Sequence, residues 1–443
     1  MPNPTSRYRI CRTQGNAGGN ALMAQHQYAS VDEEGRLILP PEIVNTWRLS
    51  QGETLRLDPN GYGWTLHPPI SCLRRIYIEV TNQCNLNCRT CMRNVWDVRP
   101  GWLAWQTFER ILEQAAECQP LPELFFGGYG EPLSHPRCLD MISQAKAKGF
   151  TVSLITNGVN LSAAVARRLV DSRLDRLWVS LDGASPECYQ DVRLGNALPQ
   201  IIENLKRLRA FQFQTFGFTP WLMTPKLGIA FVAMSRNIHN LPEVIRLGLQ
   251  LGATEFSVSN VLAHDESLQA ESLYLRSLDQ MTGGVLGEAR PLVHVPMMDI
   301  EATTASVMSQ ILGSTHRLEF MGATLGQNTC QCPFIERGSL SIRWDGKVSP
   351  CLPLLYTHTY YLGKRLRTSR EYFVGDLHQQ SLKEIWMGEE YYALRKRLLD
   401  FDFPPCTSCN SCEMADENQE DCYGNPPPTC GGCLWAQGLI RCP

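Results

Sequence analysis

Three cysteines, Cys84, Cys88 and Cys91, stand together in the stretch EVTNQCNLNCRTCMRN (residues 79–94). A tetrahedral structural zinc takes four protein ligands, and a disulfide framework needs an even number of cysteines. A cubane [4Fe-4S] cluster has four irons, and each takes a terminal ligand that is usually a cysteine thiolate. Three thiolates leave the fourth iron open to an exogenous ligand. The spacing therefore predicts a cluster that binds a small molecule at one iron.

A second set of cysteines lies toward the C-terminus, where ten of the 18 fall after residue 329. The first 22 residues lack the apolar segment of a secretory signal, so we expect cluster or metal ligands here instead of disulfides. The set is Cys330, Cys332, Cys351, Cys406, Cys409, Cys412, Cys422, Cys430, Cys433 and Cys442. Ten cysteines suffice for two clusters. A structural zinc is the alternative, because Cys406-x2-Cys409 and Cys430-x2-Cys433 also have the spacing of a zinc ribbon.

The elements that must position the first loop form a repeating pattern. From residue 74 onward, short β-rich runs alternate with amphipathic helical stretches. The runs cover residues 75–81, 123–128, 151–158, 176–183, 227–234 and 255–262. Six βα units predict an α/β fold with a parallel sheet or partial barrel. In such folds the chemistry gathers at the carboxyl ends of the strands, and the three-cysteine loop follows the first run.

Polar residues and glycines also follow or end the next three runs. They are Gly130 and Glu131, Thr156 and Asn157, and Ser180 and Asp182. Because the carboxyl ends of parallel strands lie at one rim, we expect these side chains to meet the three-cysteine loop. Residues 263–328 carry no readable motif, apart from a predicted helix at residues 271–281. No catalytic acid or base can be named from the sequence.

The Cys-x3-Cys-x2-Cys loop after a first strand resembles that of the radical S-adenosylmethionine (SAM) superfamily, whose fold is a partial (β/α)6 barrel. The resemblance implies that the open iron chelates the amino and carboxylate groups of SAM. One electron from the cluster then cleaves SAM to give a 5'-deoxyadenosyl radical. The cofactor supplies this chemistry, while the protein orients it and excludes water.

The segment FFGGYGEPL (residues 125–133) resembles the glycine-glycine-glutamate segment of the same family. The resemblance implies that Gly127, Gly128 and Gly130 let the backbone approach SAM closely, and that Glu131 faces its amino group. On its own, the segment could be a tight turn between a strand and a helix.

ITNG and VSLDG resemble the family's segments that bind the ribose and the methionyl carboxylate. This implies SAM contacts by Thr156, Asn157, Ser180 and Asp182, although Asp182 could instead cap the following turn. Arg193 resembles an arginine that reaches the SAM carboxylate, and a solvated arginine is its alternative.

The spacing of Cys332, Gly346 and Cys351 resembles the start of the SPASM extension, which carries auxiliary [4Fe-4S] clusters. SLSIRWDGKVSPC (residues 339–351) predicts a hairpin with a type I′ turn at Asp-Gly, which would hold Cys351 against Cys332 or Cys330. Cys412 follows Cys409 by two residues where SPASM spacing has five. The resemblance therefore implies two auxiliary clusters without assigning individual ligands.

Residues 28–67 resemble the swapped hairpin of AbrB-like transition-state regulators. Those proteins usually dimerise and bind DNA through basic residues. This segment has six acidic residues against three arginines, so it lacks the clustered positive charge that DNA binding needs. We expect a docking or homodimerisation module instead. The predicted organisation is a disordered tail (1–25, with Met23 as a candidate initiator), an AbrB-like domain (26–69), a radical SAM core (70–300), a linker (301–328) and a SPASM-type domain (329–443).

The net charge of −3 gives no general signal for nucleic acid or for an anionic membrane, and no apolar run is long enough to span a bilayer. We therefore expect a cytoplasmic protein. The basic runs GKRLRTSR and LRKR are interpreted as solvated faces, which an acidic electron donor such as ferredoxin or flavodoxin could use.

The cysteine-rich tail and the N-terminal hairpin together resemble radical SAM maturases associated with tungsten-containing aldehyde:ferredoxin oxidoreductases. This resemblance implies a role in building or modifying the tungsten cofactor or its host enzyme. Two alternatives stay open: a maturase acting on a ribosomal peptide, and a non-catalytic regulator that uses zinc or redox sensing to control DNA binding.

Overall fold

A computed structural model describes residues 28–47, 49, 51–59, 63–96, 98–219, 222–275, 292–295, 301–312, 317–320, 323–325, 330–409 and 412–443. Its centre is a sheet with the strand order β10-β9-β8-β7-β6-β5-β14-β15-β18. The first six of these strands are parallel. They are β5 (Arg75–Ile78), β6 (Glu123–Phe126), β7 (Val152–Thr156), β8 (Arg176–Ser180), β9 (Lys226–Ala233) and β10 (Ala253–Asn260). The predicted α/β fold with six βα units is confirmed.

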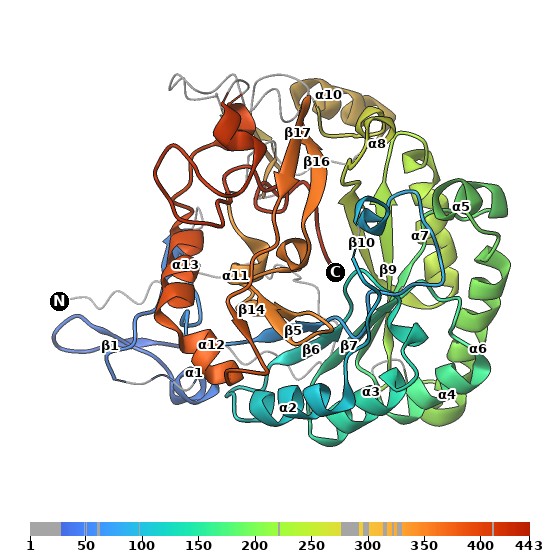
Figure 1. The fold of residues 1–443 in the computed structure, drawn as a ribbon, viewed down its shortest axis with the longest axis horizontal. Coiled ribbons are helices and arrows are strands. Elements are labelled where there is room, and N and C mark those ends of the chain that lie inside the picture. The colour runs from blue at the N-terminus through green and yellow to red at the C-terminus, as the bar shows by residue number, and fades with distance from the viewer. Residues whose placement is uncertain are drawn as a thin grey trace, which may run out of the picture.

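Helices cover the outer face of this curved sheet (Figure 1). They are α2 (Trp105–Ala116), α3 (Cys138–Ala147), α4 (Ala163–Asp171), α5 (Pro186–Arg193), α6 (Leu198–Phe216) and α7 (Leu241–Gln250). Short 3-10 turns occur in the connecting segments: η1 (Met92–Val95), η2 (Pro132–Ser134) and η3 (Ile238–Asn240). Local sequence sets some of the helix starts. The Ser185 side chain accepts a hydrogen bond from Cys188 N, and Pro186 occupies the first turn of α5, where its missing N–H costs nothing.

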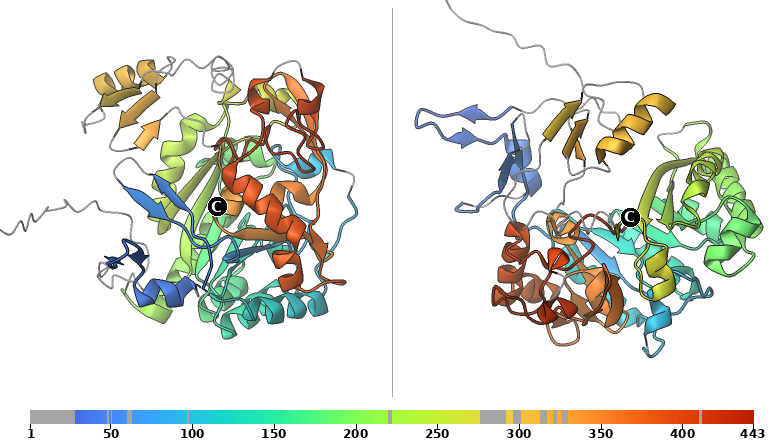
Figure 2. Two further views of the ribbon diagram at one scale, coloured as in Figure 1. Left: turned by 90° about the vertical axis from the view of Figure 1, so that its left-hand side faces the viewer. Right: turned by 90° about the horizontal axis from the view of Figure 1, so that it is seen from above.

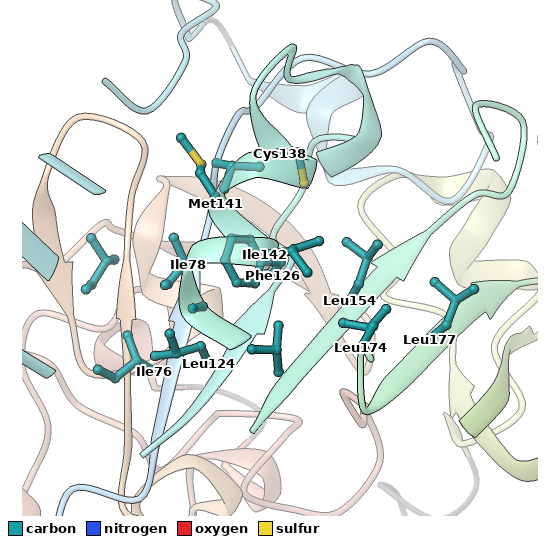
Figure 3. Packing of buried hydrophobic residues seen from close by; sticks show 14 of the residues in the cluster. Ile76, Ile78, Leu124, Phe126, Cys138, Met141, Ile142, Leu154, Leu174 and Leu177 are labelled. Carbon is teal, nitrogen blue, oxygen red and sulfur yellow. The ribbon is translucent and has the colours of Figure 1, made fainter. Parts of the chain in front are cut away.

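Strand alternation divides the buried residues into two layers. Ile76 and Ile78 of β5, with Leu124 and Phe126 of β6, pack against Met141 and Ile142 of α3 (Figure 3). The intervening residues Tyr77 and Phe125 belong to a second cluster, on the inner face, with Trp178. Successive strand side chains point to opposite faces, so inner-face residues can carry function while the outer layer stabilises the fold.

The C-terminal part extends the same sheet. Strand β14 (Ser339–Ile342) pairs parallel with β5, and β15 (Lys347–Ser349) pairs antiparallel with β14 and with β18 (Gly375–Asp376). The other elements of this part are α11 (Pro333–Glu336), η4 (Leu352–Leu355), β16 (His358–Leu362), β17 (Arg365–Ser369), α12 (Leu382–Met387), α13 (Glu389–Asp400), η5 (Cys406–Ser408) and η6 (Glu413–Asp416). Cys351 follows β15 and is therefore joined to the barrel through β14.

The predicted hairpin is present, but its turn differs from the predicted type I′. Arg343 N donates to Lys347 O at 2.9 Å, which leaves three residues at the tip. Gly346 has a φ of +86°, whereas a type I′ turn needs positive φ at both central residues and Asp345 is not in that region. Across this three-residue loop, Arg343 Nη2 donates a hydrogen bond to the Asp345 carboxylate at 2.7 Å.

The N-terminal module has two short antiparallel hairpins around a helix and projects from the body (Figure 2). Its elements are β1 (Ser30–Val31), β2 (Leu37–Ile38), α1 (Pro41–Trp47), β3 (Leu57–Pro59) and β4 (Trp64–Leu66). Helix α1 lies between the two hairpins in the chain. The AbrB-like identity stays a prediction.

A further group of elements falls between the barrel and the C-terminal part: α8 (Glu266–Ala270), β11 (Leu292–Val295), α10 (Ala302–Leu312), β12 (Arg317–Phe320) and β13 (Ala323–Leu325). Strands β11, β12 and β13 form a small sheet. The predicted linker at residues 301–328 thus contains a helix and two strands. The predicted helix at 271–281 and the predicted tail at 1–25 lie largely or wholly outside the described residues. In the described part of the chain, no helix has the length and apolar character needed to cross a membrane.

Candidate active site and auxiliary cluster sites

The three-cysteine loop leaves the carboxyl end of β5 and ends in η1. Cys91 N donates to Cys88 O at 3.1 Å, and the Asn94 side chain donates to the same carbonyl at 3.0 Å. Leu86 N approaches the Cys84 sulfur at 3.4 Å. These contacts fold the loop back on itself, so three thiols of one short segment are presented together. A donor set of three thiols fits a cluster with one open iron.

Glu131 is held at the rim by groups from two elements. Its Oε1 accepts from the Thr156 hydroxyl at 2.7 Å and from Leu133 N at 3.1 Å, and its Oε2 accepts from Asn157 N at 2.7 Å. Burial raises the pKa of this carboxyl, while the hydrogen bonds that it accepts lower it. The Asn157 amide also approaches the Cys84 sulfur at 3.8 Å. The structure therefore joins three of the predicted rim residues to the cysteine loop.

Asp182 and Arg193 form a buried ion pair. Arg193 Nη2 lies 2.6 Å from Asp182 Oδ2, Asp182 has no exposed surface, and its other oxygen accepts from Val232 N at 2.8 Å. Arg193 also reaches the Cys88 sulfur at 3.5 Å. Burial alone would lower the pKa of Arg193, but the Asp182 carboxylate and the Cys88 thiol raise it. The pair links β8 to the cysteine loop and keeps a cation beside one of its sulfurs.

Ser180 ends β8 at the same rim and is half-buried. Gly128 and Gly130 pack closely against the first strand and its loop. A Cβ on Gly128 would lie 2.7 Å from the Glu79 side chain, and one on Gly130 would lie 2.1 Å from Thr81 O. Glycine is thus required there by close contact between the loops after β5 and β6, whatever ligand they approach.

Glu79 is a buried acid that the sequence analysis missed. It follows β5 on the inner face and is 1% exposed. Its carboxylate accepts hydrogen bonds from Tyr129 N at 3.2 Å and from the Tyr356 hydroxyl. Burial raises its pKa to about 7, although the Tyr356 hydrogen bond opposes this. The sequence could have indicated this position, because Glu79 is two residues after Tyr77 and residues two apart in an extended segment point to the same face.

Aromatic rings complete this contact between the barrel and the C-terminal part. Trp96, just after the cysteine loop, stacks on Tyr356 with ring centroids 4.1 Å apart. Tyr129 donates from its hydroxyl to Leu352 O at 3.2 Å, next to Cys351 in the chain. The loops after β5 and β6 are therefore fastened to the segment that carries Cys351.

Three more buried polar side chains were missed: His264, which follows β10, His358 at the start of β16, and Tyr274. Nε2 of His358 has no hydrogen-bond partner among the described residues. Nδ1 of His264 lies 3.5 Å from the Asp265 carboxylate, and the Tyr274 hydroxyl interacts with Ser272 and with the backbone of Ala263. Burial lowers the pKa of His264, and lowers that of His358 to about 4. At neutral pH both imidazoles are uncharged and can donate or accept a hydrogen bond.

The C-terminal cysteines separate into two groups and two outliers. Cys332, Cys351, Cys430 and Cys433 line one cavity, together with apolar side chains such as Phe334 and Leu354. Cys406 lies in a second group, where its thiol is influenced electrostatically by Cys409 and Cys422. Cys412 begins η6 nearby in the chain. Cys330 is exposed and does not line the cavity, and Cys442 packs in the inner-face cluster.

Arg367 is a buried cation between these two groups. It is 3% exposed, lines the cavity of the first group and donates to Ala415 O beside the second. The run GKRLRTSR is therefore only in part the solvated face that was predicted, because Lys364 and Arg370 are exposed and Arg367 is buried. Arg365 pairs with Asp416 at 2.6 Å and Arg370 with Glu417 at 2.6 Å, so most of its charge is used within the domain. In LRKR, likewise, Arg395 is 1% exposed.

The zinc alternative for these cysteines has no support in the geometry. Among the described residues, no three His, Cys, Asp or Glu side chains converge closely enough to hold a single metal ion. A cluster places different demands on its ligands, because each thiolate binds its own iron and the sulfurs stay apart. The cavity has four cysteines in its lining, which is the number of terminal ligands that a [4Fe-4S] cluster takes.

The fold and site together define an α/β partial-barrel protein with a three-cysteine loop at its rim and a cysteine-rich C-terminal domain in contact with it. Comparison with known families agrees: residues 78–224 match the model of the radical SAM superfamily, and residues 330–413 match SPASM, an iron-sulfur cluster-binding domain. The chain is therefore a radical SAM enzyme with a SPASM domain. It binds a [4Fe-4S] cluster and SAM, and its C-terminal domain binds auxiliary iron-sulfur clusters.

Two curated relatives cover most of the chain. A protein of Pyrococcus furiosus named tungsten-containing aldehyde ferredoxin oxidoreductase cofactor-modifying protein is 28% identical over 379 residues, which are 84% of this chain and 97% of the relative. A PqqA peptide cyclase of Granulibacter bethesdensis is 24% identical over 353 residues, 79% of this chain and 82% of the relative. The crystal structure of Streptococcus suis SuiB bound to S-adenosylmethionine aligns with a TM-score of 0.48 at 16% identity, covering 80% of this chain and 73% of SuiB.

Proposed function

We propose that this enzyme modifies the cofactor of a tungsten-containing aldehyde:ferredoxin oxidoreductase, or matures its host enzyme. The supporting observation is the similarity to the cofactor-modifying protein of Pyrococcus furiosus, which extends over 97% of that protein and includes both the radical SAM and the C-terminal parts. A similarity confined to the barrel would support only the shared chemistry. The proposed reaction class is radical modification of a cofactor or protein.

Cys84, Cys88 and Cys91 are proposed as the ligands of the SAM-binding cluster. When bound, the cluster and SAM supply reductive cleavage of a carbon–sulfur bond and a radical that removes hydrogen from the substrate. Asn157 and Ser180 offer polar groups to SAM at the rim. Glu131 orients Thr156 and the backbone of Asn157 through its hydrogen bonds, so its role is at least partly to position them.

Asp182 and Arg193 are proposed to act on the loop instead of directly on SAM. The Arg193 guanidinium is engaged by the Asp182 carboxylate and lies beside Cys88, which leaves it little capacity for a ligand carboxylate. A cation next to a thiolate stabilises the deprotonated, metal-binding form. The pair would therefore favour cluster binding in the loop.

For the C-terminal domain, Cys332, Cys351, Cys430 and Cys433 are proposed to bind one auxiliary [4Fe-4S] cluster. A second would be bound by Cys406, Cys409 and Cys422, with Cys412 as the candidate fourth ligand. Cys330 and Cys442, which were included among the predicted ligands, lie outside both groups. His358, whose buried Nε2 has no hydrogen-bond partner among the described residues, is proposed to contact the substrate.

Two partners stay proposals. A reduced ferredoxin or flavodoxin would supply electrons, although the pairing of Arg365 with Asp416 and of Arg370 with Glu417 reduces the basic surface available to it. A homodimer would form through the N-terminal module, where Val31, Leu37, Ile38 and Trp64 are 49–68% exposed. An exposed apolar group of this kind marks an interaction surface.

A peptide maturase is the second candidate, because the similarity to the PqqA peptide cyclase also covers both parts of the chain. The alternative of a non-catalytic regulator is not retained, since the chain is a radical SAM enzyme. The two candidates are distinguished with the anaerobically reconstituted protein, SAM and dithionite. Formation of 5'-deoxyadenosine should increase when the immature tungsten oxidoreductase is added, with a mass or activity change in that protein. Stimulation by a short precursor peptide encoded beside the gene, with none by the oxidoreductase, would refute the first proposal.

A further inference from the structure

Two adjoining cavities lie at the amino-terminal end of the barrel strands. Their volumes are about 340 Å³ and 560 Å³, and both are lined by Arg337, Arg441 and Cys442, so together they form one groove. Arg75 and Arg176, which line the larger cavity, are the first residues of β5 and β8. The three-cysteine loop follows the other end of β5. The groove is therefore remote from the rim where SAM is proposed to bind.

The C-terminal residues give this groove a defined shape. Arg441 N donates a hydrogen bond to the Ser259 hydroxyl of β10 at 2.9 Å. Arg75 Nη1, at the start of β5, donates to Pro443 O at 3.2 Å. The segment at residues 441–443 thus contacts the first and the last strand of the barrel, and its backbone fixes where the Arg441 side chain begins.

The groove carries an excess of positive charge. Its charged lining residues are Arg74, Arg75, Arg176, Arg337, Arg441, Glu123, Glu255 and Glu336. Each glutamate already pairs with an arginine: Glu123 with Arg75, Glu255 with Arg176, and Glu336 with Arg56 of the N-terminal module. The five arginines outnumber the three glutamates, and still do if a terminal carboxylate at Pro443 is included.

Two of these arginines are accessible to a partner. Arg337 and Arg441 are both exposed. Arg337 Nη1 contacts only neutral groups, the Tyr77 hydroxyl at 3.3 Å and Cys442 O at 3.4 Å. The Arg441 side chain forms no ion pair with any residue that the structure describes. Exposed cations gathered in a groove attract and orient an acidic protein surface.

The groove also shares a wall with a cysteine-lined cavity. Phe334 and Trp435 line both the smaller cavity of the groove and the cavity that contains Cys332, Cys351, Cys430 and Cys433. Pro333, which directly follows Cys332, lines the groove as well. Aromatic side chains therefore stand between the groove and the proposed site of the first auxiliary cluster. This position favours an electron carrier over a small anion as the occupant.

We propose that the groove is the docking surface for an acidic one-electron carrier protein, which delivers its electron at the auxiliary site behind Phe334 and Trp435. The inference rests on the proposed electron donor and auxiliary cluster, and adds where the donor binds. One electron passes from the reduced carrier to the oxidised cluster; the carrier is oxidised, the cluster is reduced, and no bond forms or breaks. Because the groove is remote from the SAM rim, the carrier and the substrate can be bound together.

The test uses the full-length, cluster-loaded protein and flavodoxin, an acidic electron carrier, under anaerobic conditions. Calorimetry should show one flavodoxin bound per chain, with an affinity that falls as the salt concentration rises. Arg337→Glu and Arg441→Glu should each weaken binding about threefold to tenfold, because each replaces an attraction between exposed charges by a repulsion. Lys206→Glu, which makes the same charge change on the exposed side of α6 and outside the groove, is the matched control and should bind as the wild type does.

A second measurement separates docking from the radical chemistry. Formation of 5'-deoxyadenosine driven by reduced flavodoxin below saturation should fall in Arg337→Glu and Arg441→Glu in proportion to binding. Formation driven by dithionite, which needs no protein docking, should match the wild type in both. Failure of the wild type to form 5'-deoxyadenosine with dithionite would count against the proposed function, while calorimetry would still decide the docking.

Three results would overturn the proposal. The first is a wild-type protein that does not bind flavodoxin. The second is equal flavodoxin binding by wild type, Arg337→Glu and Arg441→Glu, or an equal loss of binding in Lys206→Glu. The third is saturable binding of inorganic phosphate that Arg337→Glu abolishes, without binding of flavodoxin, which would assign the groove to a small anion instead.

Discussion

Replacing Glu79 by glutamine should change how the stability of the enzyme depends on pH. The carboxyl group is buried on the inner face of the barrel, between Tyr129 N and the Tyr356 hydroxyl, and burial raises its pKa to about 7 from 4.5. Arg343 and Asp345 act on it with opposite signs. Glutamine keeps the shape and both hydrogen bonds, because its amide can accept from Tyr129 N and donate to the Tyr356 oxygen. The variant removes only the ionisation.

The magnitude follows from linkage. In the folded protein Glu79 binds its proton more tightly than in the unfolded chain, where a glutamate has a pKa near 4.5. The stabilisation is therefore complete below pH 4.5 and is lost as the pH rises through 7. The loss amounts to about 3 kcal/mol well above pH 7. Glu79→Gln does not undergo this loss, so its stability relative to wild type should increase from pH 5 to pH 8.

The assay is chemical denaturation of the anaerobic cluster-loaded protein at several pH values, followed by tryptophan fluorescence. Trp96, which stacks on Tyr356, is one of the ten tryptophans that contribute to this signal. Glu113→Gln on the exposed side of α2 serves as the control and should track the wild type at every pH. A constant difference between Glu79→Gln and wild type from pH 5 to pH 8 would show that Glu79 is ionised in the folded protein and would refute the reasoning.

Three other outcomes follow from the structure. Arg193→Gln leaves the buried Asp182 carboxylate unpaired and should lower the free energy of unfolding by about 3–5 kcal/mol. Adding Asp182→Asn to this variant should largely restore the lost stability. Denaturant titration measures both variants, and a loss below about 1 kcal/mol in Arg193→Gln would contradict the buried pair. Arg367→Gln removes a cation between the two cysteine groups and should lower the reduction potential of the auxiliary clusters. A redox titration followed by electron paramagnetic resonance measures these potentials. Unchanged potentials would argue against a position of Arg367 between the two clusters. Leu37→Lys together with Ile38→Lys should convert a dimer to a monomer in sedimentation; a monomeric wild type would refute dimerisation.

The fold of the barrel could be read from the sequence because each strand is a short β-rich run before an amphipathic helix. The same regularity placed Glu131, Asn157 and Asp182 at one rim, because parallel strands end together. This strand-helix pattern predicts which residues lie at the same rim of the sheet. It does not reveal which of them bind one another, so the Asp182–Arg193 pair was not anticipated.

Contacts between distant segments were outside the reach of sequence reasoning. Glu79 and Tyr356 are 277 positions apart, and nothing in either local sequence indicates the other. Arg367 and Arg395 stand in runs of charge that normally face solvent, and only the packing of the C-terminal domain shows that both are buried. The grouping of Cys332 and Cys351 with Cys430 and Cys433 has the same cause, because spacing alone allowed several partners.

The division of the cysteines into a SAM-cleaving loop and separate auxiliary sites is tested most directly by comparing Cys88→Ser with Cys430→Ser. Iron content and dithionite-dependent formation of 5'-deoxyadenosine are measured after anaerobic reconstitution. The wild type should hold about twelve irons per chain, and each variant about four fewer. Cys88→Ser should form no 5'-deoxyadenosine, while Cys430→Ser should still form it. Formation of 5'-deoxyadenosine by Cys88→Ser, or its loss in Cys430→Ser with the other clusters intact, would contradict the account.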